Sequence, residues 1–212
     1  MSKKGQSTAE IILNAVIVIF TVIGIILMLT SKAEEGALQS SGFENFKFYT
    51  VLTNVFCGIV ASVFLVFKLL KKVTEKIRAL KLAAVVGVAI TFAVVAFMFG
   101  PLYGFLQFYK RGNLYFHLLL PVTAMIEFIV VRRKKMPFRY AVYAAVPTLL
   151  YAIGYLLNIL INGIGGAWPD TNDFYGFLNW GWPVGIAIFM GIPLTAFGVA
   201  LIFRAVSNKR GL

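Results

Sequence analysis

Four residues near position 50 carry hydroxyl, amide and thiol groups at the spacing of one helix face. Thr50, Thr53, Asn54 and Cys57 lie in the stretch FKFYTVLTNVFC, which opens an otherwise apolar segment running to Leu70. Residues three, four and seven positions apart share a helix face, so we expect these side chains to point the same way. A hydroxyl or thiol becomes an effective nucleophile when a base lies within hydrogen-bond reach. This face therefore offers one half of a catalytic site.

The other half is the only histidine in the chain, His117, in the stretch NLYFHLLLP. Imidazole accepts and returns protons near neutral pH, so His117 would take the Thr50 proton and pass it to a leaving alcohol. A third group usually orients such an imidazole. The sequence leaves Asp170, Asp173 and Tyr151 open for that role.

Two neighbours of Thr50 are weighed against it as the nucleophile. Thr53 shares its face and is a possible alternative. Cys57 is the better nucleophile chemically, but it lies about 10 Å deeper along a helix, and we expect a buried small apolar residue there. Thr50 therefore stays the predicted nucleophile.

The negative oxygen formed during attack also needs hydrogen-bond donors. If the helix begins close to Thr50, the unpaired N–H groups of its first turn would serve. If Ser41 or Asn45 caps the helix instead, Thr50 lies mid-helix, and the Asn54 amide becomes the predicted donor. Both possibilities stay open at the level of sequence.

The composition requires that these residues work inside a membrane. Of the 212 residues, 60% are hydrophobic and 13% are charged, and the mean hydropathy is +0.86. The apolar runs are continuous rather than alternating, which predicts an all-α integral membrane protein and not a β-barrel. One cysteine and one histidine exclude an internal disulfide and a Cys- or His-cluster metal site, so no metal or cofactor is expected.

Six segments are long enough to cross a hydrocarbon core as helices. No linker separates them, so residues 1–212 are predicted to form one six-helix transmembrane domain, with kinks at Gly100–Pro101 and Pro121. The predicted spans are Thr8–Leu29, Phe48–Leu70, Leu82–Phe108, Leu114–Val131, Ala141–Ile161 and Pro183–Phe203.

Lysine and arginine give the predicted orientation. With both termini in the cytoplasm, sixteen of the 20 basic residues fall on cytoplasmic stretches, Lys81 among them, and the outer loops keep Lys32, Lys47, Lys110 and Arg111. This distribution explains the net charge of +12 without a nucleic-acid partner.

The orientation places the polar residues of several segments at one depth. Thr50 and His117 both fall in the outer half of the membrane. Supporting residues come from a stripe on the fifth segment and from the longest outer loop: Tyr151, Tyr155, Asn158 and Asp173. Polar residues at membrane depth usually face the bundle interior and mark function.

A second polar group is predicted at the inner side. Glu127 lies ten residues below His117, about 15 Å along a helix, and near Arg132, so we expect it to be paired or to snorkel on the cytoplasmic side rather than to orient the imidazole. Glu10 and Asn14 occupy the same inner zone and are expected to hold helices together.

The string FKFYTVLTN, followed by a helix that begins FHLLLP and carries Glu127, resembles the androgen-induced membrane hydrolases and their bacterial six-span relatives. In that family a threonine and a histidine on a later helix cleave ester bonds of fatty-acid lipids. The resemblance places the threonine at Thr50 and the histidine at His117. It implies a lipid esterase in a prokaryotic cell membrane, whose substrate is a fatty-acid ester.

Two other classes of function fit the same polar stripes. A small transporter or channel would line a path with them, although the chain shows no inverted repeat and no chain of carboxylates across the membrane. A non-catalytic membrane protein that binds lipid or a partner helix would use them for packing and recognition.

Overall fold

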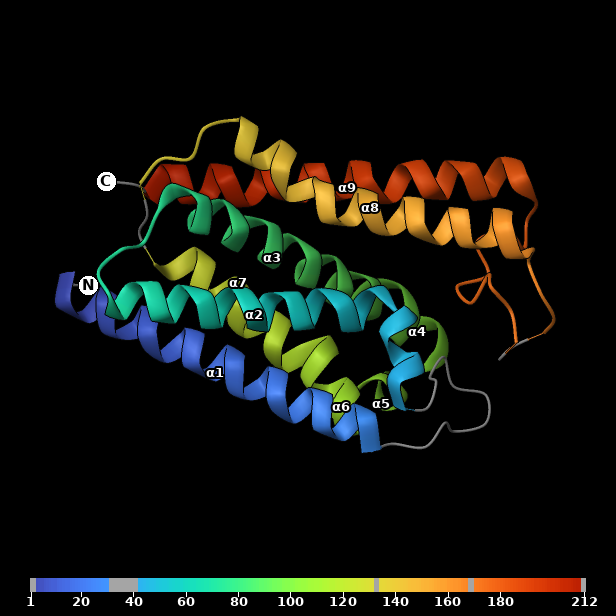
Figure 1. The fold of residues 1–212 in the computed structure, drawn as a ribbon, viewed down its shortest axis with the longest axis horizontal. Coiled ribbons are helices and arrows are strands. Elements are labelled where there is room, and N and C mark those ends of the chain that lie inside the picture. The colour runs from blue at the N-terminus through green and yellow to red at the C-terminus, as the bar shows by residue number, and fades with distance from the viewer. Residues whose placement is uncertain (1–2, 31–41, 132–133, 168–169, 211–212) are drawn as a thin grey trace.

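The computed structural model describes residues 3–30, 42–131, 134–167 and 170–210, and these residues form helices joined by turns (Figure 1). Six helical stretches are long and apolar enough to cross a membrane, which confirms the predicted all-α, six-span fold. They are Gly5–Thr30, Tyr49–Leu69, Glu75–Tyr103, Arg111–Val130, Arg139–Asn162 and Trp182–Arg210.

Four of these stretches are single helices and two are composite. The single helices are α1 (Lys3–Thr30), α2 (Tyr49–Leu69), α8 (Arg139–Asn162) and α9 (Trp182–Arg210). The third stretch joins α3 (Glu75–Val94), the π-helical turn η2 (Val95–Phe99) and α4 (Gly100–Tyr103). The fourth joins α6 (Arg111–Leu114), the π-helical turn η3 (Tyr115–Leu119) and α7 (Leu120–Val130). Two short helices complete the chain: η1 (Gly42–Lys47) and α5 (Phe105–Phe108).

The third span begins earlier than predicted. The prediction started it at Leu82 because charged residues precede that position, but α3 begins at Glu75. The Thr74 hydroxyl accepts a hydrogen bond from the Ile77 N–H at 3.4 Å and caps the helix. Lys81 therefore lies inside the helix, one turn and a half from its start, and not in a cytoplasmic loop.

Helix α3 is the centre of the bundle. It packs against α2, α7, α8 and α9, and every residue from Leu82 to Thr91 is buried. The run AAVVGVA at 83–89 makes this possible because small side chains let helices approach closely. At Gly87 an added Cβ would lie 2.9 Å from the Thr53 side chain, so glycine sets the spacing between α3 and α2.

Both predicted kink sites are preceded by π-helical turns. η2 ends one residue before Gly100–Pro101, and η3 ends two residues before Pro121. Proline cannot donate to the carbonyl one turn back, and a wider turn accommodates that lost bond. The prediction located both irregularities, and the structure gives their form.

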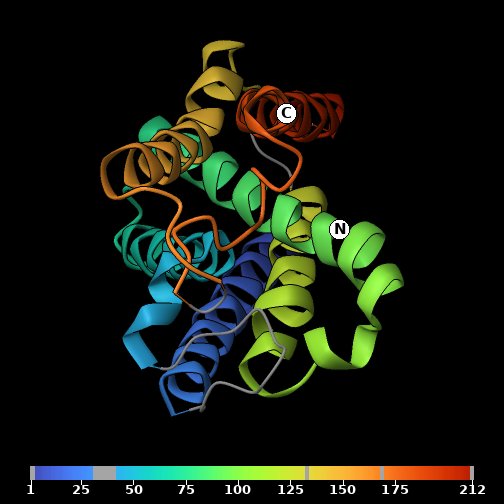
Figure 2. The ribbon, with the colours of Figure 1, turned by 90° about the vertical axis from the view of Figure 1, so that its right-hand side faces the viewer.

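The chain ends and the longer connections lie at opposite ends of the bundle. The start of α1 and the end of α9 lie at the same end of the bundle, which we call the termini end (Figure 1). The other end, which we call the loop end, carries η1, α4 to α6 and the connection between α8 and α9 (Figures 1 and 2).

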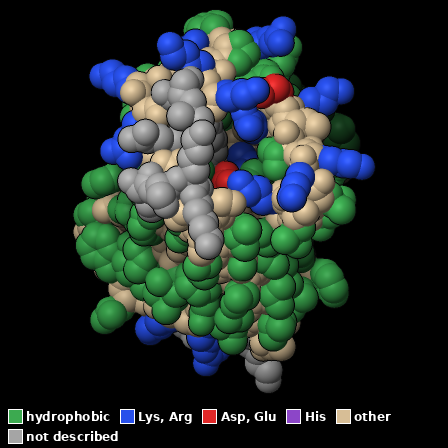
Figure 3. Space-filling view, turned by 90° about the vertical axis from the view of Figure 1, so that its left-hand side faces the viewer, with side chains coloured by type: hydrophobic (Ala, Val, Ile, Leu, Met, Phe, Trp, Pro, Cys, Tyr) green, Lys and Arg blue, Asp and Glu red, His purple; other side chains and the backbone are tan. Residues whose placement is uncertain are grey.

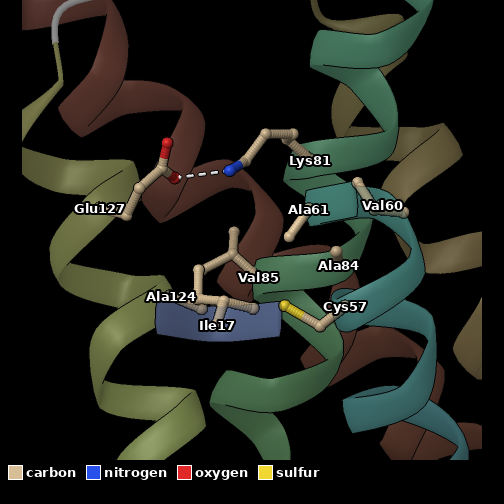
Figure 4. A pocket seen from close by; sticks show the side chains of 9 residues that line it. All are labelled: Ile17, Cys57, Val60, Ala61, Lys81, Ala84, Val85, Ala124 and Glu127. Atoms are coloured by element: carbon tan, nitrogen blue, oxygen red, sulfur yellow. Dashed lines mark ion pairs between the residues drawn. The ribbon is translucent and has the colours of Figure 1, made fainter. Parts of the chain in front are cut away.

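Lys and Arg side chains gather at the termini end, with acidic side chains among them (Figure 3). Below them, Lys81 of α3 forms an ion pair with Glu127 of α7 at 2.9 Å (Figure 4). Of the two predicted arrangements of Glu127, the structure shows the pairing, and its partner is a residue that the prediction placed before the third span. The suggested neighbour Arg132 lies outside the described residues.

Two further residues extend this network. Glu10 of α1 pairs with Lys68 of α2 at 2.6 Å. Asn14 of α1 donates to Glu127 Oε1 at 3.0 Å and accepts a hydrogen bond from Lys81. These charges link α1, α2, α3 and α7, so the predicted structural role of Glu10 and Asn14 fits the contacts that they make.

Candidate active site

The predicted nucleophile lies in the first turn of α2. The short helix η1 ends at Lys47, and Phe48 has an extended backbone (φ −81°, ψ 135°), so α2 begins at Tyr49. Thr50 is the second residue of the helix and is half-buried. The N–H of Tyr49 donates to the Tyr175 hydroxyl at 2.9 Å. The N–H groups of Val51 and Leu52 donate to the Phe48 carbonyl at 3.1 and 3.2 Å, so within the described part of the first turn the Thr50 N–H is the donor left for a negative oxygen.

The Asn54 amide has no N–H left for a negative oxygen. One of its N–H bonds is given to the Thr50 carbonyl at 2.7 Å and the other to the Phe116 carbonyl at 2.9 Å. Asn45, considered above as a cap, lies in η1, and α2 has no side-chain cap. Ser41 lies outside the described residues. Of the two predicted sources of donors, the first turn of α2 remains, and it offers the N–H of Thr50.

The rest of the polar face of α2 points into the bundle. Thr53, Asn54 and Cys57 are all buried. The Thr53 hydroxyl donates to the Tyr49 carbonyl at 2.9 Å and lies 3.2 Å from the Thr91 hydroxyl of α3. Cys57 lines a cavity of about 10 Å³ beside the Lys81–Glu127 ion pair, room for about one water (Figure 4). Both alternative nucleophiles are therefore occupied in packing.

His117 lies in the middle of the π-helical turn η3, at the loop end, and is buried. Its Nδ1 lies 2.9 Å from the carbonyl oxygen of Phe108, the last residue of α5. A carbonyl oxygen can only accept, so Nδ1 carries the proton and Nε2 of the neutral ring keeps its lone pair. The backbone of Phe108 therefore orients the imidazole, a role for which the sequence suggested side chains.

One amide joins the segments that carry Thr50 and His117. Asn54 donates to the carbonyl oxygens of both Thr50 and Phe116, so the first turn of α2 lies beside the turn that holds His117. Helix α1 presses on the same turn, since a Cβ at Gly24 would lie 2.3 Å from the Phe116 ring. Within the described residues no hydrogen bond connects the Thr50 hydroxyl directly with the imidazole.

The tyrosines of α8 belong to a separate cluster with the long connection. The Tyr151 hydroxyl donates to the Lys47 carbonyl at 2.8 Å, and the Tyr155 hydroxyl donates to Asp173 Oδ1 at 2.7 Å. Asp173 also accepts two backbone N–H groups from its own segment, at 2.8 and 3.0 Å. Tyr151 and Asp173 thus hold the loop and η1 in place, and neither is the group that contacts His117.

The asparagines of α8 continue that cluster. Asn158 donates to the Asn172 side chain at 3.2 Å and accepts from Asn162 at 2.8 Å. Asp170, the third group considered as an orienter of His117, is exposed in the same connection. These contacts tie the end of α8 to the connection that follows it.

A groove of about 240 Å³ lies between α2 and α8 at the loop end. Three of the predicted supporting residues, Tyr151, Tyr155 and Asn158, form part of its wall. The predicted supporting residues therefore divide between two places. Asn54 and Thr53 lie beside Thr50, whereas Tyr151, Tyr155 and Asn158 line this groove, and Asp173 is bonded to Tyr155.

Tyr175 is a positioning residue that the sequence did not single out. Its hydroxyl accepts the Tyr49 N–H at the start of α2, and burial raises the pKa of Tyr175 to about 12. The Tyr49 hydroxyl in turn lies 2.7 Å from the Thr148 hydroxyl of α8. Tyrosines in outer loops also form ordinary interfacial belts, so the sequence carried no signal that separates these from the rest.

Comparisons with protein-family models, with curated proteins and with solved structures found no match to this chain. The site is therefore described by its own residues and contacts.

Proposed function

We propose that this membrane protein is a lipid esterase in which Thr50 is the nucleophile and His117 is the general base. The observation that carries the proposal is the shared donor: Asn54 binds the carbonyl oxygens of Thr50 and Phe116, and His117 follows directly after Phe116. Two residue types able to form a catalytic pair thus come from segments in direct contact.

The chemistry needs two displacements at one acyl carbon. The Thr50 oxygen attacks the ester carbonyl while its proton moves to His117 Nε2, and the N–H of Thr50 in the first turn of α2 donates to the negative oxygen. His117 then protonates the leaving alcohol, which departs and leaves an acyl-threonine. A water molecule, deprotonated by the same Nε2, cleaves that ester, and the proton returns to Thr50 as the fatty acid leaves.

Three features support a lipid as the substrate. The site lies within a bundle of apolar helices, near the end of the spans, where lipid ester groups lie. The residue pattern around Thr50 and His117 resembles that of the membrane hydrolases described above. His117 is held in the tautomer that a general base requires, because its Nδ1 proton is used on Phe108.

The proposed setting is the cell membrane of a prokaryote, with both termini in the cytoplasm. The gathering of Lys and Arg at the termini end supports this orientation, because cytoplasmic ends of membrane proteins are enriched in these residues (Figure 3). Thr50 and His117 would then act in the outer leaflet.

The test is hydrolysis of a fluorogenic long-chain fatty-acid ester by the purified chain in mixed micelles. Thr50→Ala and His117→Gln are each expected to lower kcat/KM by at least about a thousandfold, as loss of a nucleophile or base does. Thr53→Ala is the matched control, since it removes a hydroxyl one turn away that is bonded within the bundle. Activity that persists in Thr50→Ala, or falls equally in Thr53→Ala, would reject the assignment.

A further inference from the structure

Residues 97–108, which we call the hairpin, leave the bundle at the loop end. Every residue from 101 to 107 is exposed, and Figure 2, which looks along the spans from the loop end, shows this part running outward from the side of the bundle. The π-helical turn η2 and Pro101 bend the third span there. The chain rejoins the bundle at Gly112, where a Cβ would lie 3.2 Å from the Gly24 carbonyl oxygen of α1.

The hairpin is folded on itself. Helix α5 packs on α4 and η2, and the Phe105 ring lies against Gly100, where a Cβ would be 2.3 Å from it. Gly104 joins the two helices with φ +86°, a conformation that residues with a Cβ rarely adopt. The Phe99 and Phe108 rings stack with their centroids 5.8 Å apart. These contacts give the hairpin a shape of its own.

The hairpin lies at the edge of the apolar belt. The Thr53 and Thr91 hydroxyls lie 3.2 Å apart, which places these residues of α2 and α3 at one depth. The second span begins at Tyr49, one turn nearer the loop end, so the third span reaches the same level near Val95. The hairpin follows that level, where hydrocarbon gives way to lipid headgroups.

The exposed side chains of the hairpin are apolar or aromatic. Its large exposed residues are Phe97, Met98, Leu102, Tyr103, Phe105 and Leu106. Residues 82–109 contain no Asp, Glu, Lys or Arg, and the exposed Lys110 and Arg111 follow them directly. The boundary between headgroups and acyl chains accepts such a surface, with apolar and aromatic side chains inserted and basic ones at the phosphates. The surface is also continuous with the apolar belt of the third span.

The last residue of the hairpin contacts the imidazole. The Phe108 carbonyl accepts the Nδ1 hydrogen bond of His117 at 2.9 Å, and the two rings lie 6.0 Å apart between centroids. One short segment therefore presents apolar side chains outward and holds the orientation of His117 at its end.

We propose that the hairpin binds the headgroup–acyl boundary of the leaflet at the loop end, and that this binding keeps the Phe108 carbonyl on His117. Leu102 and Leu106 insert among the acyl chains, and Lys110 and Arg111 contact lipid phosphates. The membrane surface thus sets the tautomer of the imidazole. The proposal does not depend on the esterase activity, because it concerns only where the hairpin lies and what it holds.

A fluorescent label tests the position of the hairpin. Nitrobenzoxadiazole is attached to Leu106→Cys in a Cys57→Ala background, since Cys57 is the only cysteine of the chain. The full chain is reconstituted in bilayers of dioleoyl-phosphatidylcholine with dioleoyl-phosphatidylglycerol. Quenching is expected to be strongest by a doxyl group near the lipid headgroup, weaker by one at the chain end, and weakest by iodide in water.

Two matched labels bracket this result. Ile59→Cys, exposed in the middle of α2, is expected to be quenched most at the chain end. Asp170→Cys, exposed in the connection between α8 and α9, is expected to be quenched most by iodide. A label on Leu106→Cys that behaves like either of these, or that a second copy of the chain shields from all three quenchers, would overturn the proposal.

Nitrogen NMR tests the link to the imidazole. His117 is the only histidine, so histidine-labelled protein in the same bilayers reports this tautomer alone. The parent chain is expected to show a protonated Nδ1 and an unprotonated Nε2. The double variant Leu102→Asp, Leu106→Asp places carboxylates on the exposed surface, which lipid disfavours, and this single species is expected to be replaced by a mixture of both tautomers.

Leu69→Asp is the control for the double variant. It makes the same exchange at an exposed leucine of the termini end and should leave the tautomer unchanged. An equal change in Leu69→Asp, or an unchanged tautomer in the double variant, would overturn the link between the membrane surface and His117. Neither measurement uses hydrolysis, so an inactive Thr50 would leave both results interpretable.

Discussion

Two fully buried asparagines, one toward each end of the bundle, make the same pair of donations. Asn14 donates to the carbonyl four residues earlier in α1 and to Glu127 of α7. Asn54 donates to the carbonyl four residues earlier in α2 and to Phe116, in the same span as Glu127. Their acceptor oxygens differ: that of Asn14 is bound by Lys81, whereas Asn54 Oδ1 has no partner among the described residues.

The difference extends to the surroundings of each asparagine. Near Asn14, side chains of opposite charge pair with each other around a cavity of about 10 Å³. At the loop end, neutral side chains such as His117 and Tyr151 bind backbone carbonyls, and a groove of about 240 Å³ lies open nearby. The termini end therefore fastens helices together, while the loop end keeps unused polar atoms and space, which chemistry and binding require.

The largest expected effect comes from removing one charge of the buried Lys81–Glu127 pair. Lys81→Met leaves Glu127 buried without its cation, and we expect it to lower the free energy of unfolding by about 3 kcal/mol or more. The double variant Lys81→Met, Glu127→Gln should recover much of that loss. Thermal unfolding in detergent, read by a thiol-reactive dye at the buried Cys57, measures both.

A double variant no more stable than Lys81→Met alone would show that the loss comes from packing of the lysine and not from the unpaired charge. The Lys81 ammonium lies 4.8 Å from the Phe64 ring centre, so such a packing contribution is physically reasonable.

Replacing each asparagine by alanine compares the two ends directly, with smaller expected changes in stability. Asn14→Ala removes hydrogen bonds to two charged groups and is expected to cost about 2 kcal/mol, whereas Asn54→Ala removes neutral ones and should cost about 1 kcal/mol. Esterase activity should respond in the opposite order, with a larger loss in Asn54→Ala. The free energy of unfolding and kcat/KM are measured on the same preparations of the two variants. A larger loss of activity in Asn14→Ala would place the active site at the termini end and contradict the proposal.

The smallest expected effect concerns Tyr175. Tyr175→Phe loses the hydrogen bond from the Tyr49 N–H and should cost about 1 kcal/mol. Because burial raises the pKa of Tyr175 to about 12, folding favours the neutral phenol. The stability that Tyr175 contributes through this shift is therefore fully present below the ordinary tyrosine pKa of about 10 and is lost as the pH rises toward 12.

Unfolding of the two proteins between pH 9 and about 12 checks this. The unmodified chain should lose more stability over that interval than Tyr175→Phe does. Parallel curves would mean that Tyr175 titrates as it does in the unfolded chain.

Hydropathy and basic residues were enough to predict the six spans, because lipid accepts only long apolar helices. The predicted start of the third helix at Leu82 was wrong because the charge of Lys81 was taken to lie outside the helix. Its partner Glu127 lies forty-six residues away in sequence, so no local pattern shows that the charge is paired. Irregular turns near Pro101 and Pro121 were predictable, whereas proline alone does not specify their π-helical form. No side-chain pattern marks the Phe108 carbonyl that orients His117, since every residue carries that group.

The most direct measurement of the central claim is to locate the covalent adduct of a lipid-like fluorophosphonate by peptide mass spectrometry. The proposal predicts an adduct on the Thr50 oxygen of the parent chain and none in Thr50→Ala. It predicts little adduct in His117→Gln, although that variant stays folded. An adduct on Thr53 or Cys57, or undiminished labelling of Thr50 without the imidazole, would contradict it.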